Sequence, residues 1–459
     1  MCITFYGGAG SVTGANYLLE SGGFRLMVDC GLIQGGHFAE RENFQPFAFQ
    51  PRDINALLVT HAHLDHVGRL PKLVGEGFRG SIYSTPPTRD LAELILIDSE
   101  HVLCKEAERE ASSPLCSIDS VDRTMQRWLP LPYHQSLTLG PFNVEFFDAG
   151  HILGSAFIQI RSRERTIVFS GDLGNSPAPI VRSTEPMPEA DHCVVESAYG
   201  DRVHEREANR QEDLEQAVRD TIARRGTLLI PTFALERTQE ILYHLNEAFE
   251  HRGVPRVPVF LDSPLAIKMT AVYKKYENYF NREASSLVRS GDDILNFPGL
   301  RLTLTTEQSK DINNVPPPKI IIAGSGMSQG GRILHHELRY LPDPQSMILF
   351  VGYQSVSSLG RQIMEGAPEV HIFGERVPIR CERRSITAYS AHADQPRLLS
   401  WLRPRAAALQ SVFVVQGEAG ASETLAGKIH HDLGATSRVP RENETIELEP
   451  ISKVGFRPK

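Results

Sequence analysis

Four side chains that commonly bind metal ions lie within six residues, in the segment Thr60-His61-Ala62-His63-Leu64-Asp65-His66. They directly follow the apolar run 54–59, which is typical of a buried strand, so they would lie where α/β folds carry chemistry. Three imidazoles and a carboxylate packed this closely are unfavourable unless something coordinates or neutralises them. Imidazole and carboxylate together suit zinc or a similar divalent ion. Because the segment offers more ligands than one tetrahedral site can use, its spacing predicts two metal positions.

Polar groups also follow four other predicted strands, and this repetition favours one shared site. They are His151 after the strand at 144–147, Asp172 after the strand at 167–169, Glu196 at the end of an apolar run, and the segment Tyr389-Ser-Ala-His392-Ala-Asp394. A single His or Asp at a strand end is usually a cap or a satisfied core group. Several such ends beside the 60–66 segment make a common metal site the better interpretation.

The order of the predicted elements indicates one α/β domain interrupted by another. Short strands joined by glycine turns fill residues 1–60, and a helical pattern runs from about 86 to 116. After residue 205 helices alternate with buried strands, a pattern typical of a parallel sheet. We therefore predict a first domain formed by residues 1–204 and 381–459, with a cap domain at 205–380 inserted between its two parts.

Composition sets the context in which such a site would work. The chain has 459 residues, 48 basic and 56 acidic side chains, and a net charge of −8, which argues against binding nucleic acid through bulk positive charge. Metal ions and local arginines could still supply the attraction. No stretch reaches the roughly 18 apolar residues that a membrane-spanning helix needs. The six scattered cysteines indicate a reducing compartment, so we expect a cytoplasmic protein without membrane contact.

Taken together, the motifs resemble the metallo-β-lactamase superfamily, whose signatures are matched by Asp29, the 61–66 segment, His151 and Asp172. The later motifs are similar to those of its β-CASP branch of RNA- and DNA-processing nucleases. They are Glu196, Ser390-Ala-His392-Ala-Asp394, Pro231-Thr-Phe-Ala234, Asp262-Ser-Pro-Leu-Ala266, Gly324-Ser-Gly-Met327 and Gly352-Tyr-Gln354. The resemblance covers almost the whole chain and is nearest to the bacterial and archaeal relatives of the mRNA 3′-end cleavage endonuclease subunit.

This resemblance implies an αββα sandwich that holds two zinc ions, with the insert forming an α/β β-CASP domain over the cleft. By position, the first ion would be held by His61, His63 and His151, the second by Asp65 and His66, and Asp172 would bridge the two. Two divalent ions activate water and stabilise the charge that develops when a phosphodiester is hydrolysed.

The resemblance also assigns roles around the metals. Asp65, His392 and Glu196 are the implied catalytic residues. His392 would act as general acid or phosphate donor, and Glu196 would orient it and favour its protonated form. Asp29 would fix a ligating histidine by a hydrogen bond from outside the ligand set.

One position departs from the β-CASP pattern. After the strand at 412–415 the family has a histidine that completes the second metal site, whereas this chain has Gln416. A glutamine carbonyl is a weaker and harder ligand than imidazole, so the second position would hold zinc less tightly or take Mg²⁺ or Mn²⁺. A natural change of metal preference, a natural loss of activity and an engineered substitution all remain open as explanations.

The insert supplies the candidate RNA contacts. They are Ser325, Gly326, Met327 and Ser328 in the glycine loop 324–331, together with Gln354 and Arg361. The loop precedes a predicted helix and could cradle a phosphate, although in isolation it reads as a plain turn. Ser263 in isolation reads as a helix N-cap. The pairs His335–His336 and His430–His431 read as surface or cap residues, because adjacent helical side chains point in different directions.

Three functions fit these motifs. The leading hypothesis is a metal-dependent ribonuclease, either an endonuclease or a 5′→3′ exonuclease, that cleaves single-stranded RNA between the two domains and forms a homodimer by family resemblance. The second is a hydrolase of a small thioester or lactone, against which stands an insert that such an enzyme would not need. The third is a non-catalytic RNA-binding relative, which only Gln416 favours.

Overall fold

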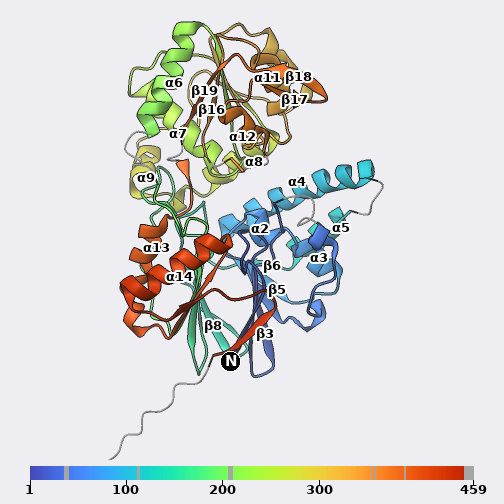
Figure 1. Ribbon diagram of the computed structural model, residues 1–459, viewed down its shortest axis with the longest axis vertical. Helices are drawn as coiled ribbons and strands as arrows, with labels where there is room; N and C mark the ends of the chain where they lie inside the picture. Colours follow the sequence, from blue (N-terminus) through green and yellow to red (C-terminus); the bar gives the residue numbers. More distant parts are fainter. Residues whose placement is uncertain are drawn as a thin grey trace, which may run out of the picture. The chain divides into compact units, whose positions relative to one another are not determined.

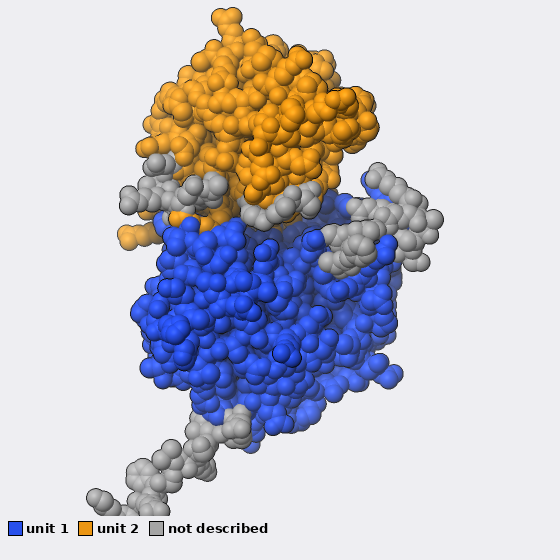
Figure 2. Space-filling model, in the orientation of Figure 1, with its two compact units in different colours: residues 1–178, 183–203, 392–459 blue, residues 179–182, 204–391 orange. Residues whose placement is uncertain are grey.

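The computed structural model describes residues 1–35, 41–110, 114–204, 210–352, 354–355, 358–386 and 389–448. These residues form two compact units, which are coloured separately in Figure 2. Unit 1 contains residues 1–178, 183–203 and 392–459, and unit 2 contains residues 179–182 and 204–391. Unit 2 continues past the predicted end at 380, because β19 (Glu382–Ser385) pairs with a strand of its sheet.

Unit 1 contains two seven-stranded sheets. The strands of the first sheet are, in spatial order, β22 (Glu444–Glu447), β1 (Cys2–Gly7), β2 (Asn16–Ser21), β3 (Phe24–Val28), β4 (Ala56–Leu58), β5 (Ser81–Ser84) and β6 (Trp128–Pro130). Those of the second are β21 (Ser437–Arg438), β20 (Ser411–Val415), β11 (His192–Glu196), β10 (Thr166–Phe169), β9 (Ala156–Arg161), β8 (Phe142–Asp148) and β7 (Leu137–Leu139). Residues 444–447 thus close the first sheet beside the N-terminal strand.

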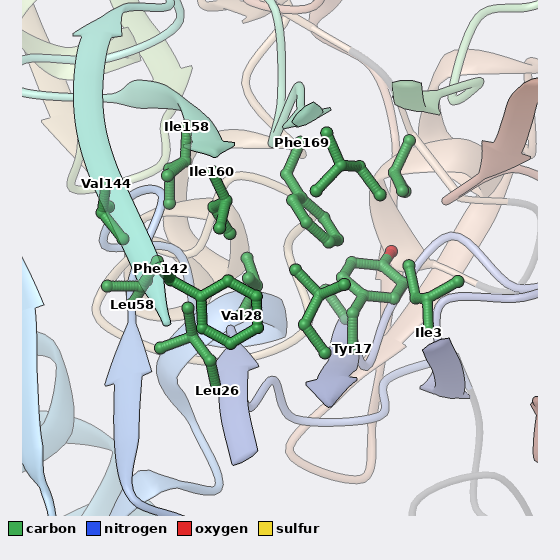
Figure 3. Close-up of a cluster of buried hydrophobic side chains, with 14 of the residues drawn as sticks. Ile3, Tyr17, Leu26, Val28, Leu58, Phe142, Val144, Ile158, Ile160 and Phe169 are labelled. Carbon is green, nitrogen blue, oxygen red and sulfur yellow. The ribbon is translucent and has the colours of Figure 1, made fainter. Parts of the chain in front are cut away.

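The two sheets share one apolar core. Alternate residues of each strand point inwards, so that Leu26 and Val28 of the first sheet lie opposite Phe142, Ile158 and Phe169 of the second (Figure 3). All of these side chains are buried. Burial on this scale fixes the positions of the strand ends, where the predicted ligands lie.

Helices cover the outer faces of the sandwich. The outer face of the second sheet packs against α13 (Gln395–Leu402) and α14 (Ala419–Leu433) through a second apolar cluster, and these helices are drawn in red in Figure 1. The helices beside the first sheet are α2 (Leu64–Val67), α3 (Leu70–Gly75), α4 (Pro86–Glu110) and α5 (Ile118–Gln126). The predicted αββα sandwich is confirmed.

Unit 2 is built around a six-stranded sheet in which every pair is parallel, as predicted. Its strands are β14 (Leu300–Leu302), β13 (Val259–Asp262), β15 (Lys319–Ala323), β12 (Thr227–Pro231), β16 (Met347–Phe350) and β19. A separate hairpin is formed by β17 (Glu369–Ile372) and β18 (Glu375–Pro378). The helices are α6 (Arg210–Arg224), α7 (Arg237–Glu250), α8 (Pro264–Lys275), α9 (Arg282–Arg289), α10 (Thr306–Asp311), α11 (Ile333–Tyr340) and α12 (Leu359–Met364).

Among the residues that the structure describes, we find no helix with both the length and the apolar character needed to cross a membrane.

Candidate metal centre

The predicted ligands come together at the carboxyl ends of strands in unit 1. His61 follows β4, His151 follows β8, Asp172 follows β10, and Gln416 follows β20, while Glu196 is the last residue of β11. Neighbouring strands place their ends at the same edge of a sheet, so residues distant in sequence meet there. Unit 1 alone supplies this whole cluster.

The first group of donors consists of His61, His63, His151 and Asp172. His63 Nδ1 lies 3.1 Å from His61 Nε2 and 3.2 Å from His151 Nε2. Asp172 Oδ2 lies 3.3 Å from His61 Nε2 and 3.6 Å from His151 Nε2. These four atoms therefore face one common point.

The donor set fits a tetrahedral zinc ion. Zinc–nitrogen bonds of about 2.0–2.1 Å place the ligand atoms of a tetrahedron about 3.3 Å apart, close to the separations observed. Burial lowers the pKa of His61, His63 and His151, which keeps these imidazoles in the neutral form that binds metal. Burial opposes ionisation of Asp172, but the neighbouring His66 and His61 outweigh it and hold the pKa of that carboxyl well below its usual range.

A second group of donors shares Asp172 and adds Asp65 and His66. His66 Nε2 lies 3.4 Å from Asp172 Oδ1 and 3.8 Å from Asp65 Oδ2. Gln416 also reaches this group, but its amide nitrogen, and not the predicted carbonyl oxygen, points at Asp172 and His66. The second group is thus less complete as a metal site than the first.

Asp29, which follows β3, is hydrogen-bonded to the 60–66 loop. Its Oδ2 lies 2.8 Å from His66 Nδ1, and its Oδ1 accepts a 2.8 Å hydrogen bond from the Thr60 amide. The Thr60 hydroxyl donates to Asp29 Oδ2 and lies 3.1 Å from His61 Nδ1. Both carboxylate oxygens are therefore used to fix His66 and the backbone that leads to His61.

His392 and Glu196 form a pair beside the first donor group. His392 Nδ1 lies 3.3 Å from Glu196 Oε2, and Glu196 Oε1 accepts a 2.6 Å hydrogen bond from the Leu173 amide. Burial lowers the pKa of His392, but the carboxylates of Glu196 and Asp172 outweigh it and raise the pKa to about 9. The His392 side chain is 27% exposed whereas Glu196 is fully buried, so the imidazole is the member that substrate can reach.

In unit 2, the predicted phosphate loop is closed by its own hydrogen bonds. The amides of Ser325, Ser328 and Ile333 donate to Gly330, Ser325 and Gly324, respectively. The Gln329 amide donates to Ser325 Oγ, and the Gly360 amide donates to Met327. The loop is therefore a turn before α11 that several of its own hydrogen bonds hold in shape.

Two of the predicted RNA contacts support this loop from inside. Ser328 is buried and its hydroxyl donates to Glu337, while the buried Gln354 amide donates to the Gly326 carbonyl at 2.9 Å. Neither side chain is open to direct contact with RNA. Arg361, in the first turn of α12, is half-buried and bonds Glu365 at 2.7 Å.

Two other expectations concern Asp262 and its neighbours. Ser263 is the N-cap of α8, accepting a hydrogen bond from the Ala266 amide, which confirms its interpretation as a cap. The prediction of a surface role for His336 is wrong, because His336 is buried and its Nε2 lies 2.7 Å from Asp262 Oδ2. A paired-histidine pattern gave no sign of this partner, which is 74 residues away along the chain.

Sequence reasoning also missed two residues of unit 1. Thr60 immediately precedes the ligand segment, and that adjacency was the available signal for its support of His61 and His66. Tyr17 is buried in β2 and donates to Gln416 Oε1 at 3.3 Å. An aromatic residue in an apolar strand gives no sequence signal for such a role.

Comparison with known proteins agrees with this geometry. Residues 18–184 match a metallo-β-lactamase superfamily domain, residues 238–363 a β-CASP domain, and residues 376–440 a Zn-dependent metallo-hydrolase RNA specificity domain. The second of these ranges lies within unit 2, and the first includes all of the 60–66 segment.

Relatives with similar sequences extend over most of the chain. A ribonuclease of Thermus thermophilus is 40% identical, with 91% of this chain and 93% of the relative covered. A transcription termination factor of Methanosarcina mazei is 30% identical, with 97% and 71% covered. A protein of unknown function from Enterococcus faecalis has a similar fold, with a TM-score of 0.54, 12% identity, and 97% and 99% of the two chains covered. The chain therefore belongs to the β-CASP family of the metallo-β-lactamase superfamily.

Proposed function

We propose that this chain is a metal-dependent ribonuclease that hydrolyses phosphodiester bonds in single-stranded RNA. The convergence of three neutral imidazoles and an ionised carboxylate on one point, next to the His392–Glu196 pair, carries the proposal. The 40% identity to a ribonuclease and the match to an RNA specificity domain favour RNA over a small thioester or lactone.

Zinc is the ion that we assign to the first donor group. His61, His63, His151 and Asp172 would hold it, and Asp65, His66 and Asp172 offer a second, weaker position that is also open to Mg²⁺ or Mn²⁺. When bound, the metal supplies a Lewis acid that activates water and stabilises negative charge on the phosphate.

His392 supplies the proton in this proposal. Its Nδ1 is held by Glu196, whose other oxygen is anchored on the Leu173 amide, so the ring has a fixed direction. The raised pKa keeps His392 protonated near neutral pH, and its second ring nitrogen can donate to the leaving oxygen or to a phosphate oxygen. Asp65, whose carboxylate is more exposed than the His66 ring, is the candidate proton acceptor at the centre.

Unit 2 is the proposed RNA-binding part. Ser325 and Met327 are the half-buried loop residues that would face the substrate, whereas Gly326 is buried and Ser328 and Gln354 hold the shape of the loop. Phe233, after β12, adds an aromatic ring that is 46% exposed. A Cβ at Gly326 would lie 2.8 Å from that ring, so the absence of a side chain lets Phe233 pack on the loop backbone. An exposed, fixed ring is suited to stack on a base.

The test is cleavage of labelled RNA by the zinc-loaded protein. Release of mononucleotides from 5′-labelled RNA would indicate a 5′→3′ exonuclease, and discrete fragments of internally labelled RNA would indicate an endonuclease. Failure to cut RNA with either Zn²⁺ or Mn²⁺, combined with hydrolysis of a thioester, would contradict the proposal.

The setting of the enzyme is also proposed. A cytoplasmic location fits the six cysteines, none of which forms a disulfide in the structure. A homodimer follows from family resemblance, and light scattering coupled to gel filtration would measure it.

A further inference from the structure

Gln416 is held in a fixed place at the end of β20. Its backbone N–H donates to the Gly8 carbonyl at 2.6 Å, and its backbone carbonyl accepts a hydrogen bond from the Ser197 backbone amide. The side chain is buried, with 3% of the residue exposed. A Cβ at Gly8 would come within 3.2 Å of Gln416 Cγ and 2.6 Å of the Tyr17 hydroxyl, so only glycine leaves room for this pair.

The amide group has a defined orientation. Gln416 Nε2 donates to Asp172 Oδ1 at 3.1 Å and lies 2.8 Å from His66 Nε2. The other ring nitrogen of His66, Nδ1, lies 2.8 Å from Asp29 Oδ2, so the ring is fixed with Nε2 directed at the Gln416 side chain. Gln416 Oε1 points away from the ligands and accepts from Tyr17. Turning the amide over would direct its oxygen at the Asp172 carboxylate, which is only an acceptor.

The NH₂ group of the Gln416 side chain cannot act as a metal ligand. An amide NH₂ group offers two protons and no available lone pair, so it cannot coordinate an ion. In the orientation observed, its nitrogen lies against both Asp172 Oδ1 and His66 Nε2, the two atoms that a second ion would need. The first donor group differs, since its histidines and Asp172 face one another with no amide between them.

We infer that the Gln416 amide is a built-in occupant of the second metal position, so that this chain holds one ion tightly and admits a second only when the amide turns over. Tyr17 makes that turn possible, because a hydroxyl can donate to the amide oxygen in one orientation and accept from the amide nitrogen in the other. The pair Tyr17–Gln416 therefore acts as a gate for the second ion. This inference rests on the metal centre of the proposed function and adds its stoichiometry and control.

Metal content of the purified full-length chain tests the gate. After equilibration with zinc and dialysis, elemental analysis should find about one ion per chain in the wild type and about two in Gln416→His, because imidazole brings a lone pair where the amide brings protons. Gln416→Glu, which also removes the NH₂ group, should likewise hold about two. Gln395→His adds the same imidazole to unit 1 outside the centre, where Gln395 bonds the Gly200 carbonyl, and should leave the content at about one.

A measurement on the unaltered protein accompanies the variants. Anomalous scattering at the zinc edge should show one strong peak among His61, His63, His151 and Asp172 in wild-type crystals. Two full peaks in the wild type, or a single ion in folded Gln416→His and Gln416→Glu proteins, would overturn the gate. These readouts need no RNA, so a wild type that binds one zinc but cuts no RNA would contradict the proposed function and leave the gate standing.

Discussion

Each unit of this protein contains a buried carboxylate surrounded by polar partners, and the two carboxylates differ in what these partners provide. Asp172 in unit 1 and Asp262 in unit 2 are both at or near full burial, and each has a histidine nitrogen close to its oxygens. Asp262 accepts hydrogen bonds from Thr303 and Ser309 and pairs with Arg332 and His336. Its partners can each donate a proton, so the group is satisfied by protein alone.

The partners of Asp172 differ in what they bring. Around its Oδ2 the neutral imidazoles of His61 and His151 face both the carboxylate and His63, so lone pairs meet at short range without enough protons between them. Such a cluster is unfavourable unless a metal ion or additional protons lie between its members, and a divalent cation meets that need. The two carboxylates thus differ in their partners, because those of Asp262 bring protons whereas those of Asp172 bring lone pairs that a metal ion could use.

Replacing each of the two aspartates separately by alanine should give the largest contrast in metal content and RNA cleavage. Asp172→Ala should lose bound metal and RNA cleavage together, because it removes a member of both donor groups. Asp262→Ala should keep the metal content of the wild type, since Asp262 belongs to unit 2 and to none of the metal-type groups of unit 1. Elemental analysis and an RNA cleavage assay on both variants measure the contrast, and loss of metal in Asp262→Ala would break it.

The His392–Glu196 pair should separate chemistry from metal binding. His392→Ala should lower kcat by about 10²–10⁴-fold, the usual contribution of general acid catalysis, while metal content stays unchanged. Single-turnover cleavage of labelled RNA measures the rate. A variant that keeps the wild-type rate would show that His392 is not the proton donor.

Asp262 should matter for stability instead. Asp262→Ala leaves the half-buried Arg332 guanidinium and the buried His336 ring without their carboxylate partner, and should destabilise unit 2 by about 3–5 kcal/mol. Urea unfolding followed by fluorescence would measure the change. Ser309→Ala, which removes a single hydroxyl donor, provides a milder control, and an unchanged midpoint for Asp262→Ala would contradict the structural role.

Glu337, a buried carboxyl group of unit 2, should make the stability of the protein depend on pH. Burial raises the pKa of Glu337 to about 8, although the Ser328 hydroxyl opposes the shift. The folded chain therefore keeps this proton up to about pH 8, whereas an unfolded glutamate releases it near pH 4.3, so stability should fall as pH rises through that window. Glu337→Gln should reduce this slope in thermal unfolding measured from pH 5 to 8. Glu365→Gln, at an exposed position, should leave the pH slope of stability unchanged. Equal slopes in the wild type and both variants would contradict the assignment of this slope to Glu337.

The smallest expected effect concerns the RNA surface of unit 2. Phe233→Ala should raise KM for single-stranded RNA by about tenfold and leave kcat nearly unchanged, since it removes a stacking surface and no reacting group. Phe233→Tyr should restore KM. Phe373→Ala, another exposed ring of unit 2, is the matched control, and an equal rise in both alanine variants would remove Phe233 from the binding surface.

Several features could be read from the sequence because they depend on local pattern. Spacing alone predicts the ligands in the 60–66 segment and the polar groups that follow strands. The alternation of helices and strands predicts the parallel sheet of unit 2. The structure brings the predicted residues of unit 1 into one cluster, including His392, although their roles stay predictions.

Other features depend on partners that spacing does not reveal. The direction of the Gln416 amide is decided by Tyr17 and Asp172, which lie 399 and 244 residues away in the sequence. Likewise, Ser328 and Gln354 look like substrate contacts until their buried partners Glu337 and Gly326 are known. Orientation and burial of polar side chains follow from tertiary packing, and motif spacing does not encode them.

The most direct test of the account restores metal to protein from which it has been stripped. Chelator-treated wild type and Asp172→Ala would be titrated with zinc while cleavage of internally labelled single-stranded RNA is followed. Cleavage should appear in the wild type as zinc binds, disappear again with chelator, and never appear in Asp172→Ala. A zinc-loaded wild type that leaves the RNA intact, or cleavage that persists in the Asp172→Ala variant, would contradict this expectation.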